Sequence, residues 1–293
     1  MKTSLSPRNG PKIMTRVNKP VLQKPHQVRK PQIRAGAIFK PNISSSQQTK
    51  IEPLSKCNFE IFAYCSRNYE DSYRFVINSW TVPDNVTKVT IYTDWNLKET
   101  NPKVEIINMF PESNSWIVGT GRRLDVIKDY SDRNKGQNKN VLFLDIDCYL
   151  VSDISEVFTR EFDIAITRLF SGEGYANRTA TAGLWFAKLT PGYYNFIEDW
   201  FKRAEQLKTA GYGVEDHRIS YVQYSFTDVA RMQTSRYSVL PIDEKVYNSE
   251  HSDERTWYNL IRKHKPKILH YKGRRFRDPK ITSLSLSLAG VKR

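Results

Sequence analysis

Residues 141–151, VLFLDIDCYLV, combine a run of four apolar residues, two aspartates one residue apart, and a second apolar run. The apolar residues predict a buried strand, and Asp145 and Asp147 fall where that pattern breaks, near the end of the strand. Residues i and i+2 of an extended chain point to one side, so both carboxylates can reach the same cation, directly or through water. Without a cation they would repel each other and one would stay protonated, so the pair predicts a divalent metal ion.

The length and composition of the chain set the class of protein. With 293 residues it can bury the core of one large α/β domain. No run of about 18 apolar residues is present, so no transmembrane helix is expected, and the N-terminal sequence lacks the apolar segment of a secretory signal. Because Cys57, Cys65 and Cys148 have no metal-binding or redox spacing, we expect reduced thiols and a cytoplasmic location.

The formal net charge of +15 comes mostly from the N-terminal segment. Residues 1–50 hold eleven Lys or Arg, six prolines and no Asp or Glu, whereas the rest holds 35 basic and 31 acidic residues. That composition cannot bury enough apolar surface to fold, so we expect residues 1–55 to form a disordered basic, proline-rich tail. The tail suits an anionic surface or nucleic acid, but a solvated tail or an organelle-targeting segment has the same composition.

After the tail, predicted strands alternate with amphipathic helices. We expect strands at residues 58–65, 88–94, 104–110, 141–147, 162–169 and 182–189, and helices around residues 73–80, 116–130 and 193–207, the second opened by a loop at Gly119 and Gly121. The alternation implies an α/β fold with a mostly parallel sheet covered by helices on both faces. Ligands would then bind at the carboxyl ends of the strands, where Tyr64, Ser66 and Asp94 join the two aspartates.

The order of the motifs along the chain resembles that of the nucleotide-sugar glycosyltransferases of the GT-A fold. These motifs are VLFLDID, TAGLWFAK, VEDH, LPIDEKVYN and PKILHYKG, and the likeness covers residues 57–276. They are most similar to metal-dependent families such as glycosyltransferase family 8 and the nucleotide-diphospho-sugar transferases. The resemblance implies a GT-A-like, Rossmann-like mixed sheet in a domain of residues 56–278, followed by a C-terminal tail of residues 279–293. It also implies transfer of a sugar, expected to be UDP-linked, to a hydroxyl of a glycan, a protein or another acceptor.

The resemblance assigns three metal ligands. Asp145 and Asp147 form the family's D-x-D motif, and their hard oxygens suit Mn²⁺ or Mg²⁺. A cation bridging both phosphates neutralises the leaving group as the sugar bond breaks. His270, in ILHYKG, matches the family's late metal-binding histidine and favours Mn²⁺. A structural role in a strand is the alternative for this histidine.

Basic residues near these ligands are candidates for holding the donor. Lys272 can reach the phosphates, and Gly273 allows the backbone to come close to them. Arg122 and Arg123 lie on the helix before the D-x-D strand, where related enzymes place a basic residue against the nucleotide or the sugar. A solvated basic surface is the alternative interpretation.

Other donor contacts are implied only by position within the resemblance. Tyr64 and Ser66 match the place where such enzymes hold the base and ribose, and Asp94 matches an acceptor of a hydrogen bond from the base. Gly183 resembles the small residue beneath the donor sugar. Each of these residues also suits a turn or a helix cap.

Glu215 and Asp216 are the candidates for a general base or an acceptor-binding carboxylate. An inverting enzyme needs a base close to the acceptor hydroxyl, whereas a retaining enzyme need not have one. Family 8 enzymes are retaining, but the sequence leaves the stereochemistry open.

Two other functions compete with glycosyl transfer. Haloacid-dehalogenase-type phosphatases also carry D-x-D after an apolar strand, but they require a small Thr or Val where Tyr149 stands. A non-enzymatic binding protein would instead use the basic tail, and its binding to nucleic acid or an anionic surface would be lost on removal of residues 1–50.

Overall fold

The computed structural model describes residues 57–111, 116–167, 180–211, 221–232, 234–250 and 254–291. They belong to one compact unit, Ile51–Arg293. The expected tail of residues 1–55 lies outside the described residues, so its boundary with the domain stays a prediction. No helix in the described ranges is both long enough and apolar enough to cross a membrane.

Seven strands form the central sheet, in the order β3-β2-β1-β4-β7-β6-β8. Their bounds are β1 (Phe59–Cys65), β2 (Val86–Thr93), β3 (Val104–Asn108), β4 (Asn140–Asp145), β6 (Ile164–Thr167), β7 (Leu184–Lys188) and β8 (Val239–Ile242). Strand β7 is antiparallel to β4 and β6, whereas the other neighbouring pairs are parallel. The mixed, mostly parallel sheet expected from the sequence is confirmed.

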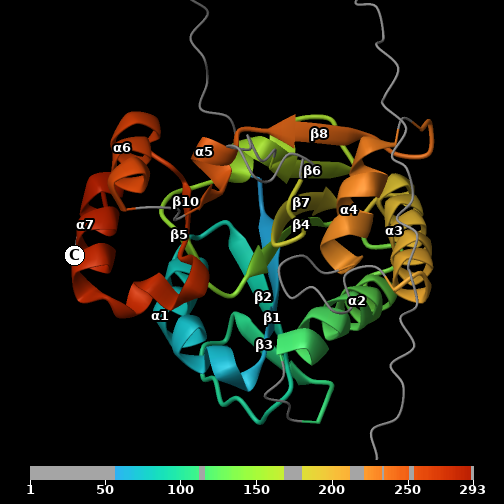
Figure 1. Ribbon diagram of the computed structural model, residues 1–293, viewed down its shortest axis with the longest axis horizontal. Coiled ribbons are helices and arrows are strands. Elements are labelled where there is room, and N and C mark those ends of the chain that lie inside the picture. Colours follow the sequence, from blue (N-terminus) through green and yellow to red (C-terminus); the bar gives the residue numbers. More distant parts are fainter. Residues whose placement is uncertain are drawn as a thin grey trace, which may run out of the picture. The chain divides into compact units, whose positions relative to one another are not determined.

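Helices lie on both sides of this sheet (Figure 1). Their bounds are α1 (Glu70–Thr81), α2 (Trp116–Arg133), α3 (Pro191–Thr209), α4 (Tyr221–Arg231), α5 (Glu244–Tyr247), α6 (Glu254–His264) and α7 (Pro279–Ala289), with short 3-10 helices η1 (Arg67–Tyr69), η2 (Ser155–Thr159) and η3 (Lys272–Arg277). Helices α2, α3 and α4 cover one face, and α1, α6 and α7 lie on the opposite side. Each face of the sheet therefore has its own apolar layer.

Strand β4 contributes to both apolar layers, which explains its continuous apolar sequence. Leu142 and Leu144 pack into the layer that includes α1, and Val141 and Phe143 pack into the layer beneath α2 and α3. Phe143 stacks on Trp185 of β7 with ring centroids 3.8 Å apart. A strand buried on both faces carries apolar residues without alternation, as the sequence predicted.

A second, smaller sheet follows β4 directly and shapes the site described below. It has the order β5-β10-β9, with β5 (Cys148–Leu150), β9 (Ser249–Glu250) and β10 (Ile268–His270). Strand β10 is antiparallel to β5 and parallel to β9. Only Ile146 and Asp147 separate β4 from β5, so the D-x-D motif bridges the two sheets.

The structure corrects the sequence-based expectation for the C-terminal segment and for the start of α2. Residues 279–289, expected to be a tail, form α7, which buries Ile281 and Leu286. Its boundary signals are Asp278, whose side chain caps the first turn, and Gly290 in the left-handed conformation at its end. Helix α2 includes Gly119 and Gly121 within its span, so these glycines do not form a loop that opens it.

The fully buried Trp80 links α1 to the second sheet, because its Nε1–H donates to the Cys148 carbonyl over 2.9 Å. We expect Trp80→Phe to lower the free energy of unfolding by about 1–3 kcal/mol, since it leaves a buried carbonyl without its donor. Urea denaturation measures this loss. Val82→Ala is the control, because Val82 is 75% exposed, and equal losses in both variants would contradict the role given to Trp80.

Candidate metal and nucleotide site

The candidate site lies at the carboxyl ends of β1, β2 and β4. Asp145 ends β4 and pairs in register with Tyr64 of β1, which in turn pairs with Tyr92 of β2. Asp147 lies in the turn between β4 and β5, and β10 places His270 beside it. The structure therefore brings together the three metal ligands that the sequence suggested, from two sheets.

His270 lies within ion-pair distance of both aspartates and is closer to Asp147 than to Asp145. The His270 Nε2 atom lies 3.1 Å from Asp147 Oδ1 and 3.9 Å from Asp145 Oδ2. Adjacent ligands of one ion with bonds near 2.1 Å lie about 3 Å apart, a separation that the Asp147–His270 pair matches and the Asp145–His270 pair exceeds. His270 and Asp147 are 1% and 9% exposed, so an ion held by them would be largely shielded from water.

Asp147 and His270 stabilise each other's charge. Burial alone would raise the pKa of Asp147 and lower that of His270. At Asp147 the nearby His270 outweighs burial and the pKa falls below its usual value, whereas at His270 the neighbouring Cys148 and Asp147 outweigh burial and the pKa rises well above its own. A cation bound at Nε2 would take the place of the imidazolium proton.

A hydrogen bond from outside the ligand set orients the His270 ring. Its Nδ1 lies 2.9 Å from Asn248 Oδ1, and Asn248 Nδ2 donates to Thr167 Oγ1 over 3.5 Å. With the amide turned this way, Nδ1–H donates to Asn248, and Nε2–H is directed at the Asp147 carboxylate; a bound cation would replace that Nε2 proton. We did not identify Asn248 as a site residue from the sequence, although it ends the LPIDEKVYN motif.

The adjacent arginines at the middle of α2 contact different strand ends. Arg122 Nη1 donates to Asp94 Oδ2 over 3.1 Å, and Arg123 pairs with Asp145 Oδ1. Asp94 is 1% exposed and also accepts from the Arg67 backbone N–H over 2.9 Å. Both arginines therefore hold site carboxylates in place, and the contact of either with a nucleotide stays a prediction.

Gly183 provides the space that Asp145 occupies. A Cβ atom at this position would lie 2.1 Å from Asp145 Oδ2, and the Asp145 N–H donates to the Gly183 carbonyl over 2.6 Å. The small residue is thus required beneath the carboxylate itself. Its expected place beneath a donor sugar remains untested.

Tyr64 and Ser66 lie at the end of β1, where the base and ribose are expected. The Tyr64 hydroxyl is buried and has no hydrogen-bond partner among the described residues. Burial raises the pKa of Tyr64, and the nearby Arg122 offsets this only in part. Ser66 precedes η1, and its side chain makes no capping hydrogen bond. The Tyr64 hydroxyl therefore lies buried beside Arg122 beneath the expected nucleoside position, and Ser66 lies at its edge.

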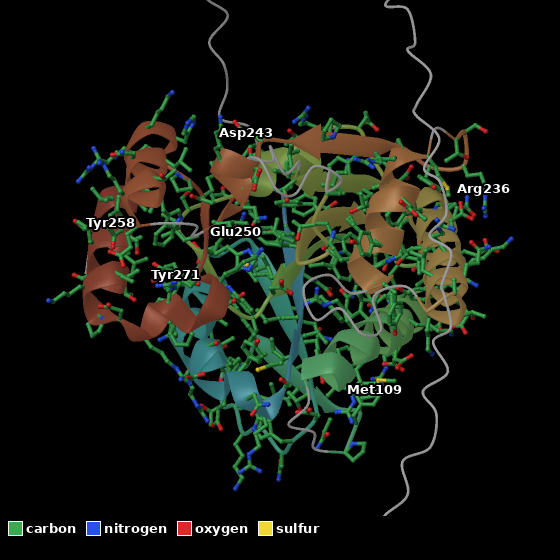
Figure 2. The ribbon with its side chains drawn as sticks, viewed as in Figure 1. Met109, Arg236, Asp243, Glu250, Tyr258 and Tyr271 are labelled. Atoms are coloured by element: carbon green, nitrogen blue, oxygen red, sulfur yellow. The ribbon has the colours of Figure 1, made fainter. Side chains whose placement is uncertain are left out.

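Lys272 is already paired in this structure. Its Nζ lies 2.6 Å from Oε2 of Glu250, which Figure 2 shows on the side of the central sheet that faces α6 and α7. Binding a phosphate would require Lys272 to leave Glu250. Gly273 follows within η3, and its contact with a phosphate stays a prediction. Glu215 and Asp216 lie outside the described residues.

Comparison with solved structures identifies the fold. An active-site mutant of LgtC, a galactosyltransferase, is 14% identical, with a TM-score of 0.51 over 79% of this chain and 95% of that one. The glycosyltransferase GlyE of Streptococcus pneumoniae is 13% identical, with a TM-score of 0.50 over 80% of this chain and 62% of that one. No protein-family model matches the sequence, and no curated protein matches it either. The chain thus has the GT-A-like fold of glycosyltransferases, while membership of family 8 stays a prediction.

Gly183→Ala, which adds one methyl group, tests whether the space at Gly183 is needed to position the Asp145 carboxylate. We expect Gly183→Ala to displace the Asp145 carboxylate and weaken Mn²⁺ binding by about tenfold or more, measured by calorimetry. The control is Gly211→Asn, because Gly211 has φ +74 and open space around its Cβ position, and Asn accepts that conformation. Unchanged Mn²⁺ binding in Gly183→Ala would show that Asp145 does not hold the ion.

The orientation of His270 by Asn248 gives a second prediction. Asn248→Ala removes the acceptor for Nδ1–H, so we expect Mn²⁺ affinity to fall by about 10–100-fold, whereas Asn248→Asp retains an acceptor oxygen and should retain most of the affinity. The paramagnetic signal of free Mn²⁺ measures binding in each variant. Similar affinities for the alanine and aspartate variants would contradict this role.

Proposed function

We propose that the chain is a metal-dependent glycosyltransferase that moves a sugar from a nucleotide-diphosphate sugar to an acceptor hydroxyl. The observation that carries the proposal is the convergence of Asp145, Asp147 and His270 at the carboxyl end of β4, within a GT-A-like fold. The resemblance of the motifs favours UDP as the carrier and Mn²⁺, or Mg²⁺, as the ion.

The charges of the site suit a diphosphate leaving group. A divalent cation, when bound, supplies Lewis-acid stabilisation of the negative charge that develops on the phosphates. Asp145, Asp147 and His270 would hold it, and Asn248 would keep Nε2 directed at it. Lys272 would exchange Glu250 for a phosphate oxygen and add a second positive charge at the leaving group.

The nucleoside would bind at the ends of β1 and β2. The position of Ser66 at the end of β1, with a hydroxyl that caps no helix, supports this placement, because it can hydrogen-bond to a base or ribose, and the Tyr64 ring would lie beneath the nucleoside. Asp94 would accept from the base with its carboxylate already fixed by Arg122. Gly273 would let the backbone approach the phosphates.

The acceptor side of the reaction is proposed from position in the sequence alone. Glu215 and Asp216 are the candidates for a general base or for binding the acceptor, which we propose to be a glycan, a protein or another hydroxyl compound. The basic residues 1–50 would localise the enzyme at an anionic partner, and we propose the cytoplasm as its location because the cysteines of the described residues are free thiols.

Neither competing function is favoured. The structural neighbours named above are glycosyltransferases, which does not support a haloacid-dehalogenase-type phosphatase. Arg123 also pairs with Asp145, the residue that such a phosphatase would need as its nucleophile. A binding protein that acts only through its tail would not need the metal-ligand geometry at β4.

Hydrolysis of UDP-sugars in the absence of acceptor tests the proposed function. We expect turnover with Mn²⁺, none with EDTA, and a loss of about 100-fold or more in Asp147→Asn, because a metal ligand stabilises the transition state by several kcal/mol. The control is Asp132→Asn, whose carboxylate is exposed and paired with Lys128 on α2. Equal turnover in all four samples would refute the metal role, and calorimetry with a panel of nucleotides would identify the carrier.

A further inference from the structure

Cys148 lies among the candidate metal ligands, although the preceding argument gives it no role. One ligand atom each from Asp147, Cys148 and His270 lie within 4.8 Å of one another. The thiol is fully buried and free of any disulfide. The cluster thus holds an oxygen, a sulfur and a nitrogen within 4.8 Å of one another, and it shares Asp147 and His270 with the candidate metal site.

Strand register explains why the thiol is there. Cys148 of β5 is the antiparallel partner of His270 of β10, and directly opposed residues extend their side chains to the same face of a sheet. The backbone of Cys148 is held from the other side, because its carbonyl accepts from Trp80 Nε1. Cys148 is therefore held beside His270 by strand pairing on one side and by the Trp80 hydrogen bond on the other.

We propose that Cys148 supplies a sulfur ligand at the metal site, so that the site prefers cations with affinity for thiolate, such as the borderline Co²⁺ and Zn²⁺ and the soft Cd²⁺, over Mg²⁺. Thiolates bind these ions strongly, whereas Mg²⁺ demands oxygen ligands. On binding, the sulfur–metal bond forms as the thiol proton passes to solvent. This inference rests on the metal-dependent function proposed above, because it concerns the same site.

A purely structural role is the competing explanation for this cysteine. Cys148 belongs to the apolar layer that includes Trp80 and Leu150, where a thiol can serve as a small apolar side chain. Valine serves that packing role equally well but cannot bind a metal. Cys148→Val therefore separates the two roles, and thermal unfolding confirms that the variant folds.

The decisive measurement is the absorption spectrum of the protein titrated with Co²⁺ without nucleotide. Wild-type protein should show both the visible bands of bound Co²⁺ and a near-ultraviolet band from charge transfer between sulfur and cobalt. Cys148→Val should retain the visible bands and lose the near-ultraviolet band. Cys65→Ser is the matched control, because Cys65 is also a buried free thiol but does not belong to the cluster, and it should retain both.

Calorimetry gives the second readout. We expect Cys148→Val to weaken Cd²⁺ binding by about tenfold or more and to change Mn²⁺ binding by less than about threefold, because only the softer ion depends on sulfur. Visible bands without the near-ultraviolet band in the wild-type protein would refute the sulfur ligand and leave the glycosyltransferase proposal intact. The absence of any Co²⁺ binding would refute both.

Discussion

The contact between Asp147 and His270 is the constraint on which the site depends. Both groups are buried, and a buried carboxylate or imidazolium is stable only when it is paired. The pairing requires β10 to lie along the chain immediately after the D-x-D motif, where the Tyr271 N–H also donates to the Asp147 carbonyl over 2.9 Å. Residues 123 positions apart are thereby fixed together, and the second sheet is attached to the end of β4.

Four acidic groups described near the candidate site each have a basic partner. Asp94 pairs with Arg122, Asp145 with Arg123, Asp147 with His270, and Glu250 with Lys272. Figure 2 labels Glu250. A divalent cation together with a diphosphate could exchange these partners without a large change in net charge. The cation would join the carboxylates, and the phosphates would take up the released lysine. The buried carboxylate of Asp147 would keep a positive partner when His270 gives up its proton.

Local sequence patterns were sufficient to predict the main elements of the fold. The unbroken apolar run of β4, the helical spacing of Tyr73, Val76, Ile77 and Trp80, and the D-x-D position all depend on neighbours within a few residues, and the structure confirms them. Helix α7 was missed because its alternating serines and leucines obscured a helical pattern that Asp278 and Gly290 delimit. The opposition of Cys148 and His270 could not be predicted, since the register between distant strands leaves no local signal.

The described residues also show how the site can be rigid before any ligand binds. Asn248 fixes the ring of His270, Gly183 leaves room for the carboxylate of Asp145, and Trp80 anchors the strand that carries Cys148. Each of these supports comes from a different element and is buried or closely packed. When the ligand side chains are held in this way before binding, little free energy is lost in ordering them as the cation binds. The cation that suits it is then selected by which ligand atoms are present, which is why a sulfur in place of an apolar group at position 148 has chemical consequences.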